Sequence, residues 1–389
     1  MRSMGAEAAS GPRAPVVIAA GGTGGHLFPA EALAQELARR GRPVVLVTDT
    51  RGKAFADTFP AGETIGVNAA TFAGKGVIAR VAALGSIVRG VGEARAHLKR
   101  LKPHAVVGFG GYPSFPAMAA AILERVPCCI HEQNAVLGRV NRFIAPMATV
   151  IASSFPALKG IAKSASSRVV VTGNPVRDAV INLAAAPYPV PGRLGPLNLL
   201  VFGGSQGAKV FSQLVPEALA QLDPHLRARL HVVQQARADD REAVAAAYAA
   251  AGVAAEVAPF FKDLPARMAH AHLVIARGGA GTVCELAVIG RPALIVPLPT
   301  AMDDHQTVNA SFLAEVGAAI AVSQKTLTPE TLARQLATLF EHPERLVLAA
   351  EAARRLGRPD ATRALADLVE NLSRRRARRA SLLFSESAS

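Results

Sequence analysis

Short runs of apolar residues, each followed by a helical pattern, recur along almost the whole chain. The first run is Val16 to Ala20, and a helical period follows from Pro29 to Arg40, with Gly41 as its C-terminal cap. Further apolar runs are at 43–48, 105–109, 126–130, 148–152, 168–172, 197–202, 229–234, 255–258, 272–276 and 293–297. Because these runs are continuous rather than alternating, they predict parallel strands covered by helices on both faces.

A unit of strand, glycine-rich turn and helix occurs at 16–40 and again at 197–222. This spacing is too long for a solenoid repeat and fits an α/β protein with two Rossmann-like, doubly wound parallel-sheet domains that face a cleft. We expect a leader at 1–13, a first domain at 14–186, a linker at 187–192, a second domain at 193–373 and a basic tail at 374–389.

The net charge of +14 is unevenly distributed. Residues 1–187 carry +11 and residues 188–389 carry +3, although five arginines lie between Arg374 and Arg379. This polarity indicates an anionic partner for one face, either nucleic acid or an acidic membrane surface, or else a solvated basic surface. The basic segments lack interleaved aromatic residues and any nucleic-acid reader motif, which argues against nucleic acid.

The pattern of residues 72–102 favours an acidic membrane surface as the anionic partner. Apolar residues at 77, 78, 81, 84 and 88 share one helical face with arginines nearby, as in a helix that lies on anionic lipid. An ordinary amphipathic core helix remains the alternative. No apolar run reaches the roughly 18 residues that a membrane span requires, and the start of the chain has no signal-peptide pattern. The three cysteines lack metal-site spacing, which indicates reduced thiols in the cytoplasm.

The glycine-rich turns are suited to a phosphate, because backbone N–H groups and a helix N-terminus can approach it closely. Neither standard signature is present: a dinucleotide fingerprint that starts at Gly22 would need glycine where Leu27 stands, and Lys209 does not follow a P-loop glycine directly. Asp49 stands where an acid could bind an NAD ribose, so dinucleotide binding stays open as an alternative.

A third glycine-rich segment, Gly278 to Thr282, offers N–H groups and a hydroxyl to a diphosphate. Glu285 follows in the next helix and can accept hydrogen bonds from ribose hydroxyls, or it can simply compensate the helix dipole. The polar cluster at 303–310 lies where an open α/β sheet binds its ligand. A capped helix start would account for its aspartates but not for Gln306.

His26 follows four glycines at the end of the first strand, which makes it a candidate general base. The loops at 108–114, 131–134 and 173–177 also follow predicted strands. We therefore expect all of these loops to line one crevice.

In chain order these loops read GGTGGH, GFGGYPS, HEQN, TGNPVR, GGSQGA, GGAGTVCEL and DDHQTVNA. Together they resemble the MurG family of peptidoglycan glycosyltransferases over residues 16–360. The resemblance implies a glycosyltransferase B fold and inverting transfer of N-acetylglucosamine from UDP-N-acetylglucosamine. The acceptor would be the 4-hydroxyl of undecaprenyl-pyrophosphoryl-N-acetylmuramoyl-pentapeptide (lipid I), and the products lipid II and UDP.

The resemblance also assigns site residues. His26 matches the catalytic base or the residue that orients it. The matches to the substrate-binding positions are Thr23, Gly24, Gly25, Asn134, Arg177, Ser205, Phe261, Ala280, Gly281, Thr282, Val283, Cys284, Glu285 and Gln306. Cys284 departs from the family pattern, in which serine is expected, and this puts only a side-chain contact in doubt.

We expect neither a metal nor another cofactor, because no Asp-x-Asp motif occurs in the crevice loops and backbone dipoles can stabilise UDP. The expected place is the cytoplasmic face of the inner membrane, as a peripheral protein, with other cell-wall synthesis and division proteins as possible partners. The alternatives are a non-catalytic nucleotide-binding regulator, which leaves His26 unexplained, and a glycosyltransferase that acts on diacylglycerol or another lipid.

Overall fold

The computed structural model describes residues 13–21, 24–49, 59–68, 77–204 and 207–372, with 77–84 described by their backbone alone. The expected leader, except Arg13, and the expected basic tail lie outside these residues.

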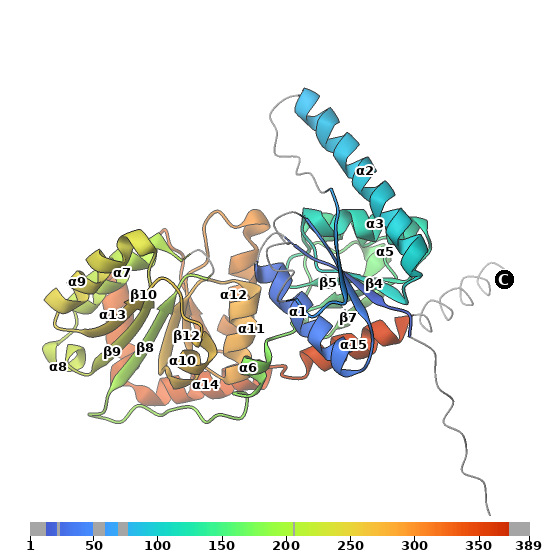
Figure 1. Cartoon of the computed structure of the whole chain (residues 1–389). Coiled ribbons are helices and arrows are strands. Elements are labelled where there is room, and N and C mark those ends of the chain that lie inside the picture. The colour runs from blue at the N-terminus through green and yellow to red at the C-terminus, as the bar shows by residue number, and fades with distance from the viewer. Residues whose placement is uncertain (1–12, 22–23, 50–58, 69–76, 205–206, 373–389) are drawn as a thin grey trace, which may run out of the picture.

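Two parallel sheets lie side by side, as the apolar runs predict (Figure 1). The first has the order β3-β2-β1-β4-β5-β6-β7 and the second the order β10-β9-β8-β11-β12-β13. The strands of the first sheet are β1 (Val16–Ala19), β2 (Val44–Thr48), β3 (Glu63–Gly66), β4 (Ala105–Gly108), β5 (Cys128–Glu132), β6 (Val150–Ser153) and β7 (Val169–Val171). Those of the second are β8 (Leu197–Phe202), β9 (Leu230–Gln235), β10 (Ala254–Ala258), β11 (Leu273–Ala276), β12 (Ala293–Ile295) and β13 (Ala319–Ala321). The predicted fold class is confirmed.

Helices cover both faces of both sheets. Those before β8 are α1 (Gly24–Arg39), α2 (Val77–Leu101), α3 (Phe115–Leu123), α4 (Arg139–Ile144), α5 (Lys163–Ser166) and α6 (Asp178–Ile181). Those after β8 are α7 (Lys209–Ala220), α8 (Pro224–Arg227), α9 (Arg241–Ala250), α10 (Leu264–His270), α11 (Ala280–Ile289), α12 (His305–Ala314), α13 (Pro329–Glu341), α14 (Pro343–Leu356) and α15 (Ala361–Glu370).

The central strands β1 and β4 of the first sheet are buried at every position because helices cover both faces of that sheet. Val16 and Ile18 pack on the α1 face of the first sheet, whereas Val17 and Ala19 pack on the face covered by α2, α3 and α4. Successive residues of a strand point to opposite faces, so two cores need two apolar residues in a row.

Two strands, β3 and β13, are missing from the expectations above. Both are at sheet edges, and β3 buries Ile65 but leaves Gly66 exposed. Only two residues of β13 follow its buried Ala319, and both are exposed. Edge strands do not have to be apolar on both faces, so β3, with the sequence ETIG, has no continuous apolar run. Strand β13 is apolar but only three residues long, AIA.

Helix α1 begins at Gly24, five residues before the expected start at Pro29. Proline is most common in the first helical turn, which places the predicted start there. Pro29 instead lies inside the helix, so His26 belongs to its first turn. The other end is confirmed, because Gly41 has φ +68° and Arg42 N–H donates to the Leu37 carbonyl at 2.9 Å.

The packing boundary between the two domains differs from the predicted one. Val176 and Val180, expected in the first domain, pack in the core of the second. Leu365 and Val369 of α15, expected in the second domain, pack in the core of the first, where Figure 1 shows α15 beside α1. The sequence shows where helical patterns stop, but not which core an amphipathic helix joins.

Ion pairs accompany the packing of α15. Arg40, at the end of α1, donates to Asp367 at 2.6 Å and to Glu370 at 2.9 Å. Asp367 is largely exposed, so this pair adds little stability. The buried leucines and valine of α15 therefore supply most of the attachment.

We predict that Leu365→Ala destabilises the first domain by about 2–5 kcal/mol, because it leaves a cavity under α1. Hydrogen exchange read by mass spectrometry should rise in peptides from β1, β2 and β4. As a control, Leu336→Ala, equally buried in α13, should raise exchange in β8 and β9 instead. Faster exchange in the second sheet alone after Leu365→Ala would contradict the assignment of α15.

Candidate active site

Loops at the carboxyl ends of strands from both sheets meet between the two domains. Asn309 in α12 accepts from Ala135 N–H at 2.8 Å, and its amide donates to the Asn134 side chain at 3.0 Å. Arg177 donates to Glu285 at 3.0 Å. These bonds join the loops after β5 and β7 to the helices after β11 and β12, so the predicted crevice contains loops from both domains.

The imidazole of His26 lies against the loop after β4. A Cβ atom added at Gly110 or Gly111 would lie 3.5 Å from the His26 ring, and both glycines have positive φ. Glycine adopts this conformation at low cost, and it keeps the loop free of side chains beside the ring. On its other side, His26 Nδ1 lies 3.1 Å from Gln133 Oε1.

Gln133 connects His26 to a second histidine. Its amide nitrogen lies 3.1 Å from His131 Nδ1, and His131 Nε2 lies 3.3 Å from the Gly173 carbonyl oxygen. His131 is fully buried, with its ring 5.1 Å from that of Phe109. Burial lowers the pKa of His131 to about 4, so the ring is neutral at physiological pH.

Glu132 holds the loop after β5 in shape. Its carboxylate accepts from the backbone N–H groups of Asn134 at 3.0 Å and Gly138 at 2.9 Å, and from the Asn141 amide at 2.8 Å. A buried carboxylate is costly unless its oxygens are hydrogen-bonded, and these bonds meet that requirement. The Glu132 carboxylate thus fixes both Asn134 and the start of α4.

Arg177 and Glu285 form the main ion pair across the site. Arg177 also lies over the ring of Phe28 in α1, at 5.4 Å from its centroid. Burial raises the pKa of Glu285, and the neighbouring Arg177 guanidinium opposes that rise. Glu285, which the sequence predicts to accept hydrogen bonds from ribose hydroxyls, is thus paired with Arg177, another predicted site residue.

The N-terminus of α11 presents its first N–H groups to the cleft side of β11. Gly279 is its N-cap, and the first three helical residues are Ala280, Gly281 and Thr282, whose N–H groups have no acceptor within the helix. Val283 differs, because its N–H donates to the Gly279 carbonyl at 3.0 Å and its side chain is buried in the core.

Gln306 lies directly over the glycine-rich loop that precedes α11. A Cβ atom at Gly278 would lie 2.4 Å from the Gln306 carbonyl oxygen, so only glycine fits there. The Gln306 side-chain oxygen accepts from Leu298 N–H at 2.9 Å, which ties it to the loop after β12.

The remaining predicted residues are placed as follows. Gly24 and Gly25 are the first two residues of α1. Phe261 follows β10, with its ring buried beneath the Arg267 guanidinium at 4.3 Å. Thr23 and Ser205 lie outside the described residues.

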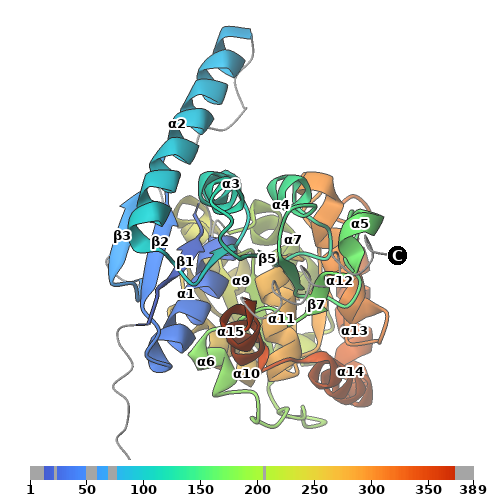
Figure 2. The ribbon, with the colours of Figure 1, turned by 90° about the vertical axis from the view of Figure 1, so that its right-hand side faces the viewer.

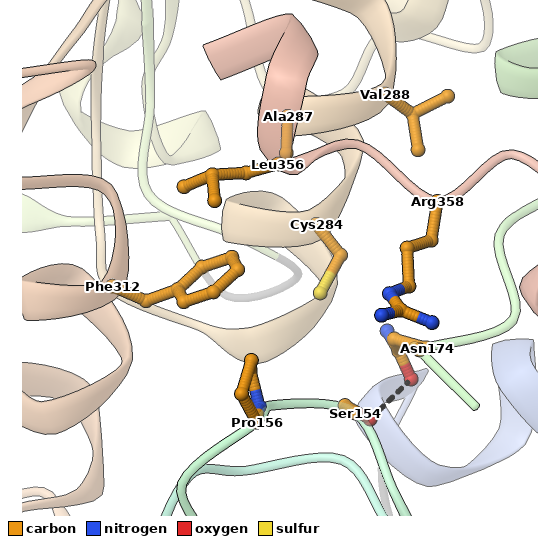
Figure 3. A pocket seen from close by; sticks show the side chains of 10 residues that line it. Ser154, Pro156, Asn174, Cys284, Ala287, Val288, Phe312, Leu356 and Arg358 are labelled. Carbon is orange, nitrogen blue, oxygen red and sulfur yellow. Dashed lines mark hydrogen bonds between the residues drawn. The ribbon is translucent and has the colours of Figure 1, made fainter. Parts of the chain in front are cut away.

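Cys284 faces away from the helix N-terminus, toward a small cavity between the domains. The cavity, of about 20 Å³, is lined among others by Ser154, Asn174, Phe312 and Arg358, and Figure 3 shows the thiol directed into it. Burial raises the pKa of the Cys284 thiol to about 12. This volume holds about one water molecule, so the cavity is too small for a nucleotide.

Gln133, His131, Asn309 and Phe28 were not assigned site roles from the sequence. The first three stand within the quoted motifs HEQN and DDHQTVNA, but each of them also bonds to a separate loop: Gln133 to His26, His131 to Gly173 and Asn309 to Asn134. Among the described residues, no group of three or more His, Cys, Asp or Glu side chains is arranged to hold a metal ion. No described helix is long and apolar enough to cross a membrane.

Comparison with protein families identifies the class. Residues 16–153 match the glycosyltransferase family 28 N-terminal domain, and residues 198–371 match the glycosyltransferase family 28 C-terminal domain. The chain therefore belongs to glycosyltransferase family 28, and its relatives place it in the MurG group of that family.

Two of these relatives carry the name UDP-N-acetylglucosamine–N-acetylmuramyl-(pentapeptide) pyrophosphoryl-undecaprenol N-acetylglucosamine transferase. One, from Methylobacterium sp. (strain 4-46), is 56% identical over 91% of this chain and 95% of its own length. Another, from Rhodospirillum centenum, is 52% identical over 92% of this chain and 94% of its own.

Solved structures agree with this placement. The crystal structure of Acinetobacter baumannii MurG matches with a TM-score of 0.76 and 34% identity, over 92% of this chain and 99% of that one. A UDP-GlcNAc 2-epimerase from Neisseria meningitidis, bound to UDP-GlcNAc, matches with a TM-score of 0.64 at 14% identity, over 90% of this chain and 98% of that one. The second likeness is one of fold alone.

We predict that His131 makes stability depend on pH. An unfolded histidine titrates near pH 6.5, whereas His131 in the folded chain titrates near 4. Between these values the unfolded chain binds one more proton, so this contribution to the free energy of unfolding falls as pH falls, by about 3 kcal/mol in all. Urea unfolding at pH 7 and pH 4 should show the advantage of the wild type over His131→Asn shrinking toward pH 4. An advantage independent of pH would contradict the burial of a neutral ring.

Proposed function

We propose that this chain transfers N-acetylglucosamine from UDP-N-acetylglucosamine to the 4-hydroxyl of lipid I, forming lipid II and UDP. The observation that carries this proposal is the meeting of loops from both domains at one site. The first domain contributes the imidazole of His26, and the second contributes the helix N-terminus that precedes Glu285. The loops of the two domains are joined by the Arg177–Glu285 pair and by the bonds of Asn309 to Asn134 and Ala135. The relatives, which align over nine tenths of the chain, are named for this reaction.

The donor would be bound mainly by the second domain. The free N–H groups of Gly281 and Thr282, with Ser205, receive the diphosphate, because a helix N-terminus attracts anions. Glu285 accepts from the ribose hydroxyls in exchange for its bonds to Arg177. Gln306 and Asn134 bind the sugar, and the backbone at Phe261 meets the uracil. Gly24, Gly25 and Thr23 approach the donor from the first domain, and Val283 and Cys284 support the helix by packing.

His26 acts as the general base at the acceptor. Its Nε2 takes the proton of the 4-hydroxyl while that oxygen bonds to the anomeric carbon. The bond from that carbon to the UDP oxygen breaks, and its electron pair leaves with the diphosphate. Attack from the face opposite UDP inverts the anomeric centre, and the N–H groups at the start of α11 stabilise the charge that develops.

We further propose that the α2–α3–α4 side of the first domain meets the anionic membrane surface. Figure 2 shows these helices along one side of the molecule, with α2 extending beyond the rest of the domain. Large apolar side chains are exposed on all three, namely Val88, Leu123 and Phe143, and Met147 follows α4. Arg139 and Arg142 stand beside Phe143 in α4, which combines apolar and cationic groups as an interfacial surface requires.

Helix α4 connects this surface to the chemistry. Asn141 points inward, where its amide bonds Glu132 and lies close to Gly110, whereas Phe143 is 63% exposed. An acceptor with its lipid chain in the membrane can thus extend its sugar past α4 to His26. This arrangement favours a peripheral position on the cytoplasmic face of the inner membrane, where other cell-wall synthesis and division proteins would be neighbours.

We predict that His26→Ala lowers turnover by at least about 100-fold, the lower end of what a general base contributes. The Kd for UDP should stay within about twofold, because the proposed UDP contacts lie in the second domain. UDP release and calorimetric UDP binding measure the two effects separately. A variant that retains a tenth of wild-type turnover would exclude His26 as the base.

The acceptor decides between the proposed function and its strongest alternative. UDP release should be rapid with a lipid-linked muropeptide and absent with diacylglycerol in the same detergent. The product of the first reaction should carry a β-linked N-acetylglucosamine, as inversion requires. Faster turnover of diacylglycerol would overturn the proposal.

We predict that Phe143→Ser weakens binding to vesicles that contain anionic lipid, because an exposed apolar anchor is lost from a basic surface. Leu348→Ser is the matched control, since Leu348 is also 63% exposed but lies in α14 of the second domain. Binding of the wild type should fall steeply as salt is added. Equal losses from both variants in a flotation assay would argue against this face.

A further inference from the structure

We propose that Gln133 and His131 are positioning residues that hold His26 in the tautomer with its proton on Nδ1, so that Nε2 is free to accept the hydroxyl proton. This inference rests on the proposed function and adds two residues to it. It follows from three hydrogen bonds that run from the buried end of the loop cluster to the cleft.

The buried end fixes the tautomer of His131. Its Nε2 lies 3.3 Å from the Gly173 carbonyl oxygen, which can only accept, so Nε2 carries the proton. Because the buried ring is neutral, its Nδ1 has an unprotonated lone pair. His131 therefore presents an acceptor toward Gln133.

The orientation of the Gln133 amide follows. One end of this amide lies 3.1 Å from His131 Nδ1 and 3.2 Å from the His131 carbonyl oxygen. Both are acceptors, so the NH₂ group occupies this end and the carbonyl oxygen points the other way. A flipped amide would place its oxygen against two lone-pair acceptors.

The amide oxygen in turn selects the proton on His26. Gln133 Oε1 lies 3.1 Å from His26 Nδ1, and an oxygen acceptor requires a proton on that nitrogen. The tautomer of a neutral imidazole is set by the hydrogen bond that one ring nitrogen makes, so Nε2 is left with the lone pair. It lies beside Gly111, where a Cβ atom would come within 3.5 Å of it.

The residues that form this chain of hydrogen bonds orient the His26 ring and are themselves uncharged. Gln133 and His131 are neutral, and the carboxylate of Glu132 is occupied by Asn134, Gly138 and Asn141. The carboxylate of Asp49, from the end of β2, lies beside Gly21. When His26 takes the proton of the hydroxyl, the imidazolium keeps its Nδ1–H bond to Gln133, and the new proton leaves from Nε2 to solvent.

Four variants test the proposal by activity. Gln133→Met, similar in length but without the amide, should lower kcat by about tenfold to 100-fold while the Kd for UDP is unchanged. Gln133→Glu places a carboxylate against Nδ1–H and should move the acidic limb of the kcat/KM profile up by about one pH unit or more. His131→Leu should resemble Gln133→Met, whereas His131→Asn, whose side-chain oxygen can replace Nδ1 as acceptor, should restore most of the loss.

A spectroscopic measurement keeps this test separate from the proposed function. In ¹⁵N spectra of histidine side chains, with His26→Ala used for assignment, neutral His26 should show a protonated Nδ1 in the wild type and a protonated Nε2 in Gln133→Met. Gln234→Met is the control, because Gln234 is also a buried glutamine but lies in β9 of the second domain, where it accepts from the Tyr248 hydroxyl. It should change thermal stability but neither the tautomer nor the pH profile.

The outcomes are distinguishable. A wild-type chain without turnover on lipid-linked muropeptide would refute the proposed function, and the ¹⁵N spectra would still decide the tautomer. A Gln133→Met chain that keeps the Nδ1–H tautomer and the wild-type pH profile would overturn the positioning role. A switch of tautomer together with rescue by His131→Asn would establish it.

Discussion

All strands of both sheets run in parallel, and the site depends on this constraint. Parallel strands direct their carboxyl ends to one edge, so loops that are distant in sequence meet there. His26, Gln133, Glu285 and Gln306 follow four different strands and come together for this reason. Because both faces of each sheet are buried under helices, these edges are also where backbone N–H groups and polar side chains remain available to a ligand.

The two sheets are held together by exchanged segments as well as by the loops. Val176 and Val180 leave the first domain to pack in the second, and α15 returns from the second domain to the first. Both exchanges are apolar and buried, whereas the bonds of Asn134, Asn309, Arg177 and Glu285 between the domains are polar. Hydrogen bonds and ion pairs of this kind can be replaced by hydrogen bonds to a ligand. A donor can therefore bind without disturbing the apolar contacts that attach the domains.

The sequence predicts the two domains, eleven of the strands and the set of loops, because each depends on local pattern. It does not predict β3, since Glu63–Gly66 has no continuous apolar run, or β13, which is only three residues long. It also does not predict the partner core of α15, which depends on three-dimensional packing alone. Within the site, Gln133 and His131 are visible as motif letters, but their bonds to His26 and Gly173 join loops from opposite ends of the first domain. A motif can indicate that a residue type is needed without showing which atom it must face.

Helix α4 combines three kinds of residue: one that supports the site, one that is exposed and apolar, and two that are basic. Asn141 binds Glu132 and so supports the loop with Gln133, while Phe143 is exposed toward the proposed membrane side. Arg139 and Arg142 lie within 4 Å of Asp303, in the second-domain loop that leads to Gln306. Asp303 and Asp304 both adopt left-handed φ, which costs about 1 kcal/mol or more for each residue without glycine's freedom. The two arginines attract Asp303 across a partly exposed surface, which offsets little of this cost. In the proposed membrane orientation the same guanidinium groups face anionic lipid. Part of the net charge of +14 therefore has a proposed role: the arginines of α4 lie beside the second-domain loop that leads to Gln306 and belong to the surface proposed to meet the membrane.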